Sequence, residues 1–176
     1  MIKNLLAFIA VLTTATVSTY ANPTHSKELY SQASMPEMYC MALNIYHEAR
    51  GDNLAGKYAV SDVVLNRVKS TRYPNTICEV IKQGPTKPSW KDDSKLIPVR
   101  NKCQFSWWCD GKSDEPRDAD AWLEAQEIAY LIMQLENFVG ISEGSTHYHA
   151  TYVNPDWNKK MQHVGRIGSH LFFRQP

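Results

Sequence analysis

The spacing of apolar residues changes along this chain, and that change constrains the fold more than any other feature. In three long segments before residue 137, apolar residues recur at every third or fourth position, which is typical of helices with one buried face. After Gly140, β-branched and aromatic residues gather over 146–153 and 171–173, which predicts short strands. The sequence therefore predicts a mainly helical α+β fold with a small antiparallel sheet near the C-terminus.

Start and stop signals place the long helices. Ser34, a proline and Glu37 form a capping box that predicts the beginning of a helix, and Gly51 predicts its end. Two further helices are expected over 54–69 and 119–136.

The segment between these last two helices is less regular. A second capping box, Thr76 to Glu79, predicts a short helix that Gly84 ends. From residue 85 to 117 the helical spacing is lost, and a connection of this length inside a compact domain is usually functional. Residues 104–108 are predicted to form an extended strand within it.

The N-terminus has the pattern of a secretory signal peptide. Lys3 gives a positive start, residues 5–17 are apolar and uncharged, and Thr19 to Ala21 place small residues where a signal peptidase cuts. We expect cleavage after Ala21, because the apolar run is shorter than the roughly 20 residues that a membrane span needs. Export to the periplasm or outside the cell follows, with no stable membrane insertion after the signal is removed.

The composition suits one packed domain. Hydrophobic residues make up 43% of the 176 residues, which is enough for one core. We expect a signal peptide over 1–21, a flexible leader over 22–35 and a single, monomeric domain over 36–176. The net charge is +1, and the longest basic run is a pair such as Lys159-Lys160, so nucleic acid is not an expected partner.

Export would place the four cysteines in an oxidising compartment, where disulfides form. In an oxidising compartment, Cys40, Cys78, Cys103 and Cys109 predict two disulfides, with three connectivities open. An extended strand over 104–108 would hold Cys103 and Cys109 roughly 20 Å apart, beyond the limit of about 7 Å for a disulfide. A bond between these two would require a tight loop instead. Buried free thiols are the alternative.

One carboxylate stands out from its surroundings. On the first predicted helix, Glu48 falls at the margin of the apolar stripe that contains Met41 and Ile45. A half-buried carboxyl group has a raised pKa, so it can keep a proton near neutral pH and donate it to a leaving group. The alternative is a glutamate at the rim of the stripe that reaches water or pairs with Arg50.

Six separated blocks then show a resemblance. In this order along the chain, they are similar to motifs of the cell-wall hydrolase family that includes the spore cortex-lytic enzymes. The resemblance spans roughly residues 36–174. The blocks lie at 42–51 (ALNIYHEARG), 59–68 (AVSDVVLNRV), 73–78 (YPNTIC), 103–107 (CQFSW), 146–150 (THYHA) and 167–173 (IGSHLFF).

The resemblance implies a lysozyme-like fold and action on the glycan strands of peptidoglycan, with Glu48 as the single catalytic acid and no cofactor. It also implies lytic transglycosylation, in which the C6 hydroxyl of muramic acid captures the sugar and forms a 1,6-anhydro product. Asp52 stands where family members often have Glu, and we expect it to cap the helix over 54–69.

Substrate contacts are expected from two strands. On the strand over 104–108, Gln104 and Ser106 would face the sugar while Phe105 enters the core. Tyr148 and His149 would contact N-acetyl sugars from a second strand, and packing within that strand is the alternative for both. Four tryptophans would serve as stacking platforms or as core residues: Trp90, Trp107, Trp108 and Trp157.

Other chemistries remain open. A hydrolase would need a second acid, and Asp110, Glu143 and Asp156 lie on predicted loops. A zinc-dependent amidase that cuts the peptide from the glycan would use His147 and His149, which share a face of a predicted strand. The third zinc ligand would be His47, His163 or Glu48. A secreted wall-binding module without catalysis would explain the cysteines and tryptophans but not the position of Glu48.

Overall fold

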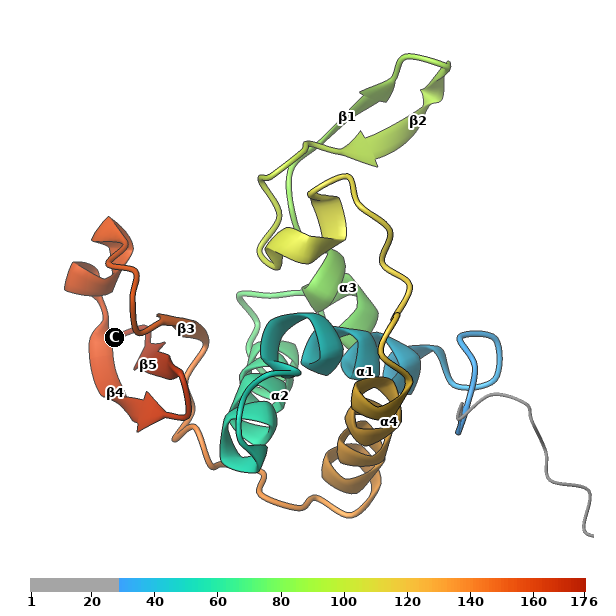
Figure 1. The fold of residues 1–176 in the computed structure, drawn as a ribbon. Coiled ribbons are helices and arrows are strands. Elements are labelled where there is room, and N and C mark those ends of the chain that lie inside the picture. Colours follow the sequence, from blue (N-terminus) through green and yellow to red (C-terminus); the bar gives the residue numbers. More distant parts are fainter. Residues whose placement is uncertain (1–28) are drawn as a thin grey trace, which may run out of the picture.

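The computed structural model describes residues 29–176, so the predicted signal peptide and most of the predicted leader lie outside the described residues. Figure 1 shows a body of helices, a small sheet beside it and a hairpin that projects from the body. In the described part of the chain, no helix has the length and apolar character to cross a membrane.

The predicted helices are confirmed, with small shifts at their ends. Those of the described residues are α1 (Pro36–Ala49), α2 (Leu54–Lys69), α3 (Ile77–Lys82) and α4 (Ala119–Gln134). Helix α1 packs against the other three, and its Met41, Ala42 and Ile45 are completely buried. The core of the body therefore surrounds the helix that carries Glu48.

Of the two predicted helix caps, one is confirmed and one is wrong. Thr76 caps α3, since its hydroxyl accepts a hydrogen bond from the backbone N–H of Glu79. The predicted capping of α1 by Ser34 is wrong, because Ser34 hydrogen-bonds with Ser31 instead. Glu37 of the same motif accepts hydrogen bonds from the first N–H groups of α3, at 2.6 Å from Ile77 N. It therefore joins α1 to α3 rather than closing its own helix.

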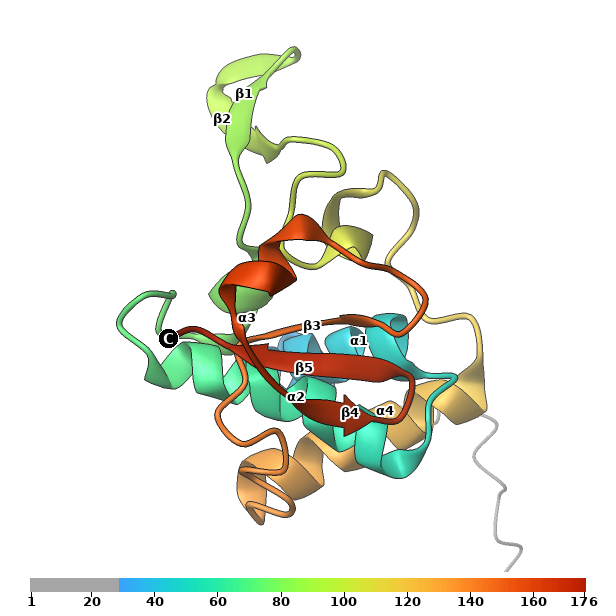
Figure 2. The same cartoon turned by 90° about the vertical axis from the view of Figure 1, so that its left-hand side faces the viewer.

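The predicted C-terminal sheet is present, with one strand more than expected. It contains β3 (His147–Ala150), β4 (Gln162–Ile167) and β5 (His170–Arg174), all antiparallel, in the order β3-β5-β4. Figure 2 shows this sheet in front of α2. Phe172 of β5 is completely buried against Ala59 and Val63 of α2. Helix α2 is thus buried on two faces, one toward α1 and one toward the sheet.

A buried carboxylate fixes the chain that leads from α4 to this sheet. Asp62 of α2 is completely buried and accepts hydrogen bonds from Gly140 N at 2.9 Å and from Ser142 N at 3.0 Å. The Ser142 hydroxyl donates to the same carboxylate at 2.6 Å. These bonds place the start of β3 relative to α2.

The strand predicted over 104–108 is wrong. This stretch enters the 3₁₀ helix η1 (Ser106–Cys109), and Cys103 and Cys109 are disulfide-bonded across a tight loop. Phe105 and Trp107 are both buried, so the alternation that suggested a strand is real, but the stretch belongs to neither of the described sheets. The second disulfide joins Cys40 of α1 to Cys78 of α3.

Two other segments differ from the sequence expectation. Within 85–117 lies an antiparallel hairpin of β1 (Thr86–Ser89) and β2 (Asp92–Pro98). A second 3₁₀ helix, η2 (Asp156–Lys160), precedes β4.

The last part of the predicted flexible leader is packed on the body. Tyr30 is buried on α4, and its hydroxyl donates to the Gln126 carbonyl at 2.9 Å.

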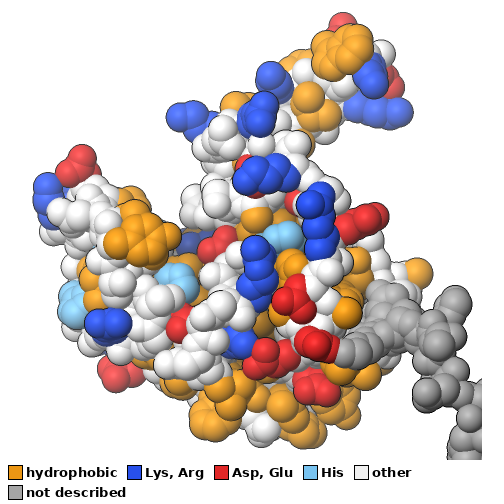
Figure 3. Space-filling view, viewed as in Figure 1, with side chains coloured by type: hydrophobic (Ala, Val, Ile, Leu, Met, Phe, Trp, Pro, Cys, Tyr) orange, Lys and Arg blue, Asp and Glu red, His pale blue; other side chains and the backbone are white. Residues whose placement is uncertain are grey.

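The surface is hollowed where the sheet and the helical body meet. The space-filling view in Figure 3 shows a hollow between the lobe formed by the sheet and the body, and this hollow opens toward the projecting hairpin. Residues on the facing sides of α1 and β3 therefore border an open depression.

Candidate active site

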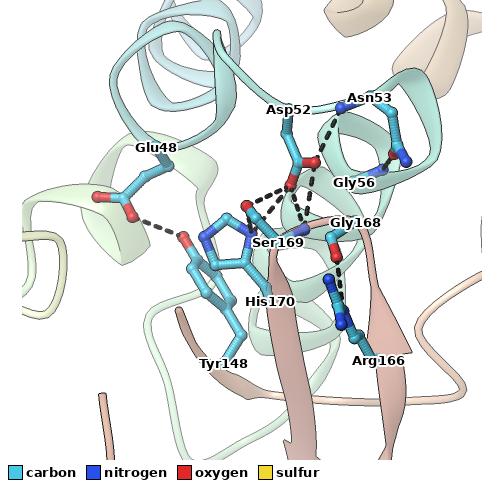
Figure 4. A network of polar contacts seen from close by, with 9 residues as sticks. All are labelled: Glu48, Asp52, Asn53, Gly56, Tyr148, Arg166, Gly168, Ser169 and His170. Atoms are coloured by element: carbon cyan, nitrogen blue, oxygen red, sulfur yellow. Dashed lines mark hydrogen bonds and ion pairs between the residues drawn. The ribbon is translucent and has the colours of Figure 1, made fainter. Parts of the chain in front are cut away.

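Glu48 and Tyr148 meet at the junction of the body and the sheet. Glu48 lies in the last turn of α1 and is partly buried. As Figure 4 shows, its side chain points toward β3, where the Tyr148 hydroxyl donates a hydrogen bond to Glu48 Oε2 at 3.0 Å. The two residues are 100 positions apart in the sequence, so the pair exists only in the folded chain.

The surroundings of Glu48 favour its protonated form. Burial raises the pKa of Glu48, while the hydrogen bond from Tyr148 and the charge of Arg67 act to lower it, and the net pKa is raised. The C-terminal end of a helix carries partial negative charge, which also disfavours a carboxylate there. Glu48 is therefore suited to hold a proton and release it to a bound group.

Tyr148 keeps its own proton. Burial and the nearby Glu48 carboxylate raise the pKa of Tyr148 well above its ordinary value. The phenol is thus a fixed donor toward Glu48 across the neutral pH range. Its ring packs against His170, at 5.1 Å between ring centroids, and against Phe172 at 5.7 Å.

Arg67 is a buried charge that the sequence analysis missed. It lies on α2 with an exposed fraction of 4%, and its Nε donates to the Thr146 carbonyl at 2.8 Å. Its guanidinium group faces the rings of Tyr73 and Phe105 at 5.4 and 5.1 Å, and its Nη1 has no hydrogen-bond partner. A signal was present, since Arg67 continues the apolar spacing of Val60 and Val64.

The charge of Arg67 also acts on the sheet. Burial lowers the pKa of His147 to about 4, and the positive charge of Arg67 contributes to the shift. His147 is therefore neutral at physiological pH. Its Nδ1 lies 3.0 Å from the Thr146 hydroxyl.

Asp52 joins the end of α1 to the β4–β5 turn, so its predicted role as the cap of α2 is wrong. The cap is Asn53, whose side chain accepts from Gly56 N at 2.9 Å. Asp52 instead accepts from the backbone N–H and hydroxyl of Ser169 at 3.0 and 2.8 Å, and from His170 Nδ1 at 3.2 Å (Figure 4).

These bonds set the charge state of the Asp52 cluster. Burial by itself would raise the pKa of Asp52, but the hydrogen bonds from Ser169, Asn53 and His170 lower it below its usual range. Burial lowers the pKa of His170, against the influence of Asp52. The cluster is thus a carboxylate that accepts a hydrogen bond from a neutral imidazole.

A glycine permits this close approach. Gly168 has φ +58°, and a Cβ built there would collide with the Asp52 carboxylate. Both the backbone conformation and the lack of space require glycine at this turn.

The predicted substrate residues do not all face the same region. Gln104 and Ser106 are exposed on the loop closed by the Cys103–Cys109 disulfide. His149 is buried, with Nδ1 2.9 Å from the Ala150 carbonyl and Nε2 3.1 Å from Asn158 Nδ2. Both of its ring nitrogens have hydrogen-bond partners within this part of the chain. Tyr148 contacts Glu48 directly.

The other candidate acids have local partners. Asp110 pairs with Lys112 at 3.4 Å, and Asp156 pairs with Lys159 at 2.9 Å. Glu143 is exposed in a turn with positive φ. Within residues 29–176, no three His, Cys, Asp or Glu side chains lie together as ligands for a metal ion, so the zinc alternative finds no ligand set there.

Two cavities lie beside α1, and Glu48 lines neither. One of about 310 Å³ is bordered by Leu43 and Trp108, and one of about 350 Å³ by His47 and Arg50. Trp107 lines both. Glu48 instead lies at the junction with the sheet, where it contacts Tyr148.

Comparisons with known proteins agree on one family. A family model described as Cell Wall Hydrolase matches residues 51–173, a range that begins three residues after Glu48. Two curated spore cortex-lytic enzymes of Bacillus cereus are each 44% identical to this chain over 48 residues. That match covers 27% of this chain and 18% of each relative.

Two solved structures are similar over most of the chain. One is the catalytic domain of the germination-specific lytic transglycosylase SleB from Bacillus anthracis, with 23% identity and a TM-score of 0.57. The alignment covers 84% of this chain and 98% of that domain. The other is the catalytic domain of the Bacillus cereus SleB protein, with 21% identity, a TM-score of 0.52, and coverage of 88% and 99%. At these identities, the likeness establishes a shared fold, which is lysozyme-like.

Proposed function

Because this chain belongs to the Cell Wall Hydrolase family, we propose that it is an enzyme that cleaves the glycan strands of peptidoglycan, with Glu48 as its catalytic acid. The bond cut is the β-1,4 linkage between N-acetylmuramic acid and N-acetylglucosamine. The observation that carries the proposal is the partly buried Glu48 carboxyl, which has a raised pKa and a tyrosine donor at the edge of an open hollow.

Glycosidic cleavage needs an acid on the leaving oxygen and a nucleophile for the sugar. Protonated Glu48 donates to the glycosidic oxygen as the bond from that oxygen to the muramic C1 breaks. The C6 hydroxyl of the same sugar then bonds to C1, and its proton passes to the Glu48 carboxylate. A 1,6-anhydro sugar forms, Glu48 regains its proton, and water does not enter the reaction.

This route requires one protein carboxylate, which agrees with the site. Two of the other candidate acids, Asp110 and Asp156, pair with lysines, and Glu143 lies in an exposed turn, whereas Glu48 is the carboxylate that Tyr148 contacts. Once Glu48 has given up its proton, the Tyr148 hydroxyl and the charge of Arg67 stabilise the carboxylate that remains. The same two groups are present before and after the transfer, so little rearrangement is needed.

Substrate binding is proposed along the hollow. Gln104 and Ser106 are exposed and polar, and we assign them to contacts with the N-acetyl sugars. We propose that the enzyme acts outside the cytoplasmic membrane, in the periplasm or secreted, and that it works as a monomer. We propose that the segment over 1–21 is the signal for that export and is removed after Ala21.

The test is digestion of purified peptidoglycan followed by mass spectrometry of the soluble fragments, with and without EDTA. Glu48→Gln should lower the rate by at least about 100-fold, the usual contribution of a general acid. The matched control is Glu127→Gln, an exposed glutamate on α4, which should cleave normally.

Each product type has a distinct meaning. Fragments that end in 1,6-anhydromuramic acid support the proposal. Reducing muramic ends would indicate hydrolysis with a second acid. Peptides released only without EDTA would replace the proposal with a zinc amidase, and the absence of any cleavage would favour a binding module.

A further inference from the structure

The hairpin of β1 and β2 projects from the body as an arm (Figures 1 and 2). We define the arm as residues 86–98, in which Lys87 pairs with Ile97 and Pro88 with Leu96. Most of its side chains are exposed. A two-stranded hairpin with so little burial is only marginally stable, so core packing does not account for the arm.

The tip of the arm presents an aromatic ring to solvent. Trp90 has an exposed fraction of 84%, and Leu96 one of 66%. The ammonium group of Lys91 lies 5.1 Å from the centroid of the Trp90 ring. Lys91 thus lies over one face of the exposed Trp90 ring, and an aromatic surface with an ammonium group next to it fits a sugar ring bearing an acidic substituent.

The arm and its base together carry an excess of positive charge. Residues 82–102 contain six Lys or Arg and two Asp, of which the arm itself holds three Lys and both Asp, and the whole chain has a net charge of +1. Figure 3 shows blue side chains clustered on the arm and below it. Lys95 pairs with Asp92 at 3.4 Å, which leaves an excess of cations on this segment. A concentrated positive field attracts a polyanion.

The edges of the arm do not favour pairing with another strand. Pro88 lies within β1 and Pro98 at the end of β2. Proline and lysine on an exposed edge prevent strand addition. A second copy of this chain is therefore a poor occupant, and contact has to come through side chains.

We propose that the arm binds the peptide-bearing glycan of peptidoglycan outside the hollow and so anchors the enzyme on its substrate. Trp90 stacks on a sugar ring, while Lys87, Lys91 and Lys95 pair with the carboxylates of the stem peptides. The hollow between the sheet lobe and the body opens toward the arm (Figure 3), so one glycan strand can reach both. The inference rests on the proposed function for its substrate class.

Binding is measured by co-sedimentation with insoluble peptidoglycan, using Glu48→Gln so that the substrate is not consumed. Adding Trp90→Ala should weaken binding about fivefold or more, as should replacing Lys87, Lys91 and Lys95 together by Gln. Changing the same lysines to Arg keeps the charge and should preserve binding. Tyr130→Ala, an exposed aromatic on α4, is the control for Trp90. Binding of the parent should fall as salt is added.

A kinetic comparison separates anchoring from catalysis. With Glu48 intact, the arm variants should raise KM on whole peptidoglycan and leave kcat on short soluble glycan fragments unchanged. Their melting temperatures should match the parent, because the arm contributes little to the core. Equal binding by the parent and the arm variants would overturn the inference.

Other outcomes identify other occupants. If the arm variants lose the parent's binding to phosphatidylglycerol vesicles but bind peptidoglycan as the parent does, the arm would be assigned to a membrane surface. A parent dimer that the arm variants convert to monomers would assign it to self-association. If binding depends on the arm but the protein with Glu48 intact does not cleave glycan, the inference about the arm is supported and the proposed function is refuted. If the protein with Glu48 intact cleaves glycan but binding does not depend on the arm, the proposed function is supported and the inference about the arm is refuted.

Discussion

At the residue scale, the pKa of Glu48 is set by opposing influences. Burial raises it, and the Tyr148 hydroxyl and the Arg67 charge lower it. A catalytic acid needs such a balance, because a carboxyl with too low a pKa has lost its proton and one with too high a pKa donates poorly. The two flanking residues therefore tune the acid as well as hold it.

Tyr148→Phe tests this balance. The change removes the hydroxyl and keeps the ring that packs on His170 and Phe172. The pKa of Glu48 should rise, so the alkaline limb of kcat/KM should move to higher pH. The maximal rate should fall about tenfold, because the carboxylate formed after proton transfer loses a donor. Rates on soluble glycan fragments from about pH 4 to pH 9 give the profile, and a limb that stays in place would contradict the assignment.

Glu48→Gln should also stabilise the fold. Because burial raises the pKa of Glu48, the folded chain at pH 7.5 must either take up a proton or bury a carboxylate that the unfolded chain would solvate. Glutamine carries no charge, and its carbonyl oxygen can still accept from Tyr148. The free energy of unfolding should rise by about 1 kcal/mol at pH 7.5, and the gain should shrink as the pH falls to the range in which the unfolded chain also protonates Glu48. Urea unfolding measures it, and a less stable variant would refute the argument.

Sequence patterns reached some of these residues and missed others. Glu48 was singled out by its position at the edge of an apolar stripe, which is a local property of one helix, and its role as the acid is a prediction from the family resemblance. Asp52 was misassigned, since its main partner Ser169 lies 117 residues away and no local pattern reports such a contact. Arg67 is a charged residue at a position of the apolar stripe of α2, which is a detectable signal, but its position near Glu48 and Tyr148 depends on tertiary packing.

At the element scale, periodicity identified helices better than strands. The helices are long enough for their spacing to be distinctive, whereas a run of five residues such as 104–108 is not. Phe105 and Trp107 alternate with exposed neighbours, yet the chain turns because a disulfide closes it and no strand of the described sheets pairs with it. Strand formation depends on partners that the sequence does not reveal.

The two disulfides should differ in their contribution to stability. Cys40 and Cys78 are 38 residues apart, and Cys103 and Cys109 are six apart. Because a cross-link restricts the unfolded chain more when its loop is longer, replacing the first pair by Ala should cost about 4 kcal/mol and the second about 2 kcal/mol. Urea unfolding of the two double variants checks the order, and a larger loss from the short loop would contradict it.

At the scale of the whole molecule, buried histidines should make the fold sensitive to acid. Burial lowers the pKa of His147 to about 4 and also lowers that of His170. The unfolded chain protonates these groups near pH 6.5, so it binds more protons than the folded chain below that pH. Stability is therefore complete above about pH 7 and is lost as the pH falls. The lowered pKa of Asp52 adds a further loss below about pH 4.

Thermal unfolding across pH measures this effect. The melting temperature should be about 5 °C lower at pH 4.5 than at pH 7, and His147→Gln should reduce the difference. His163→Gln is the matched control, because His163 is exposed on β4. If the melting temperature of the His147→Gln variant falls with pH as steeply as that of the parent, His147 does not cause the acid sensitivity.

The central place of β5 in the sheet fixes when the site can form during synthesis. Strand β3, which carries Tyr148, pairs with β5 and not with β4. A ribosome completes Glu48 early, but Tyr148 has no partner strand until residues 170–174 have emerged. The nascent chain therefore carries its acid long before the hydroxyl that orients it is fixed. The contact between Glu48 and Tyr148 can therefore form only after residues 170–174 have been made.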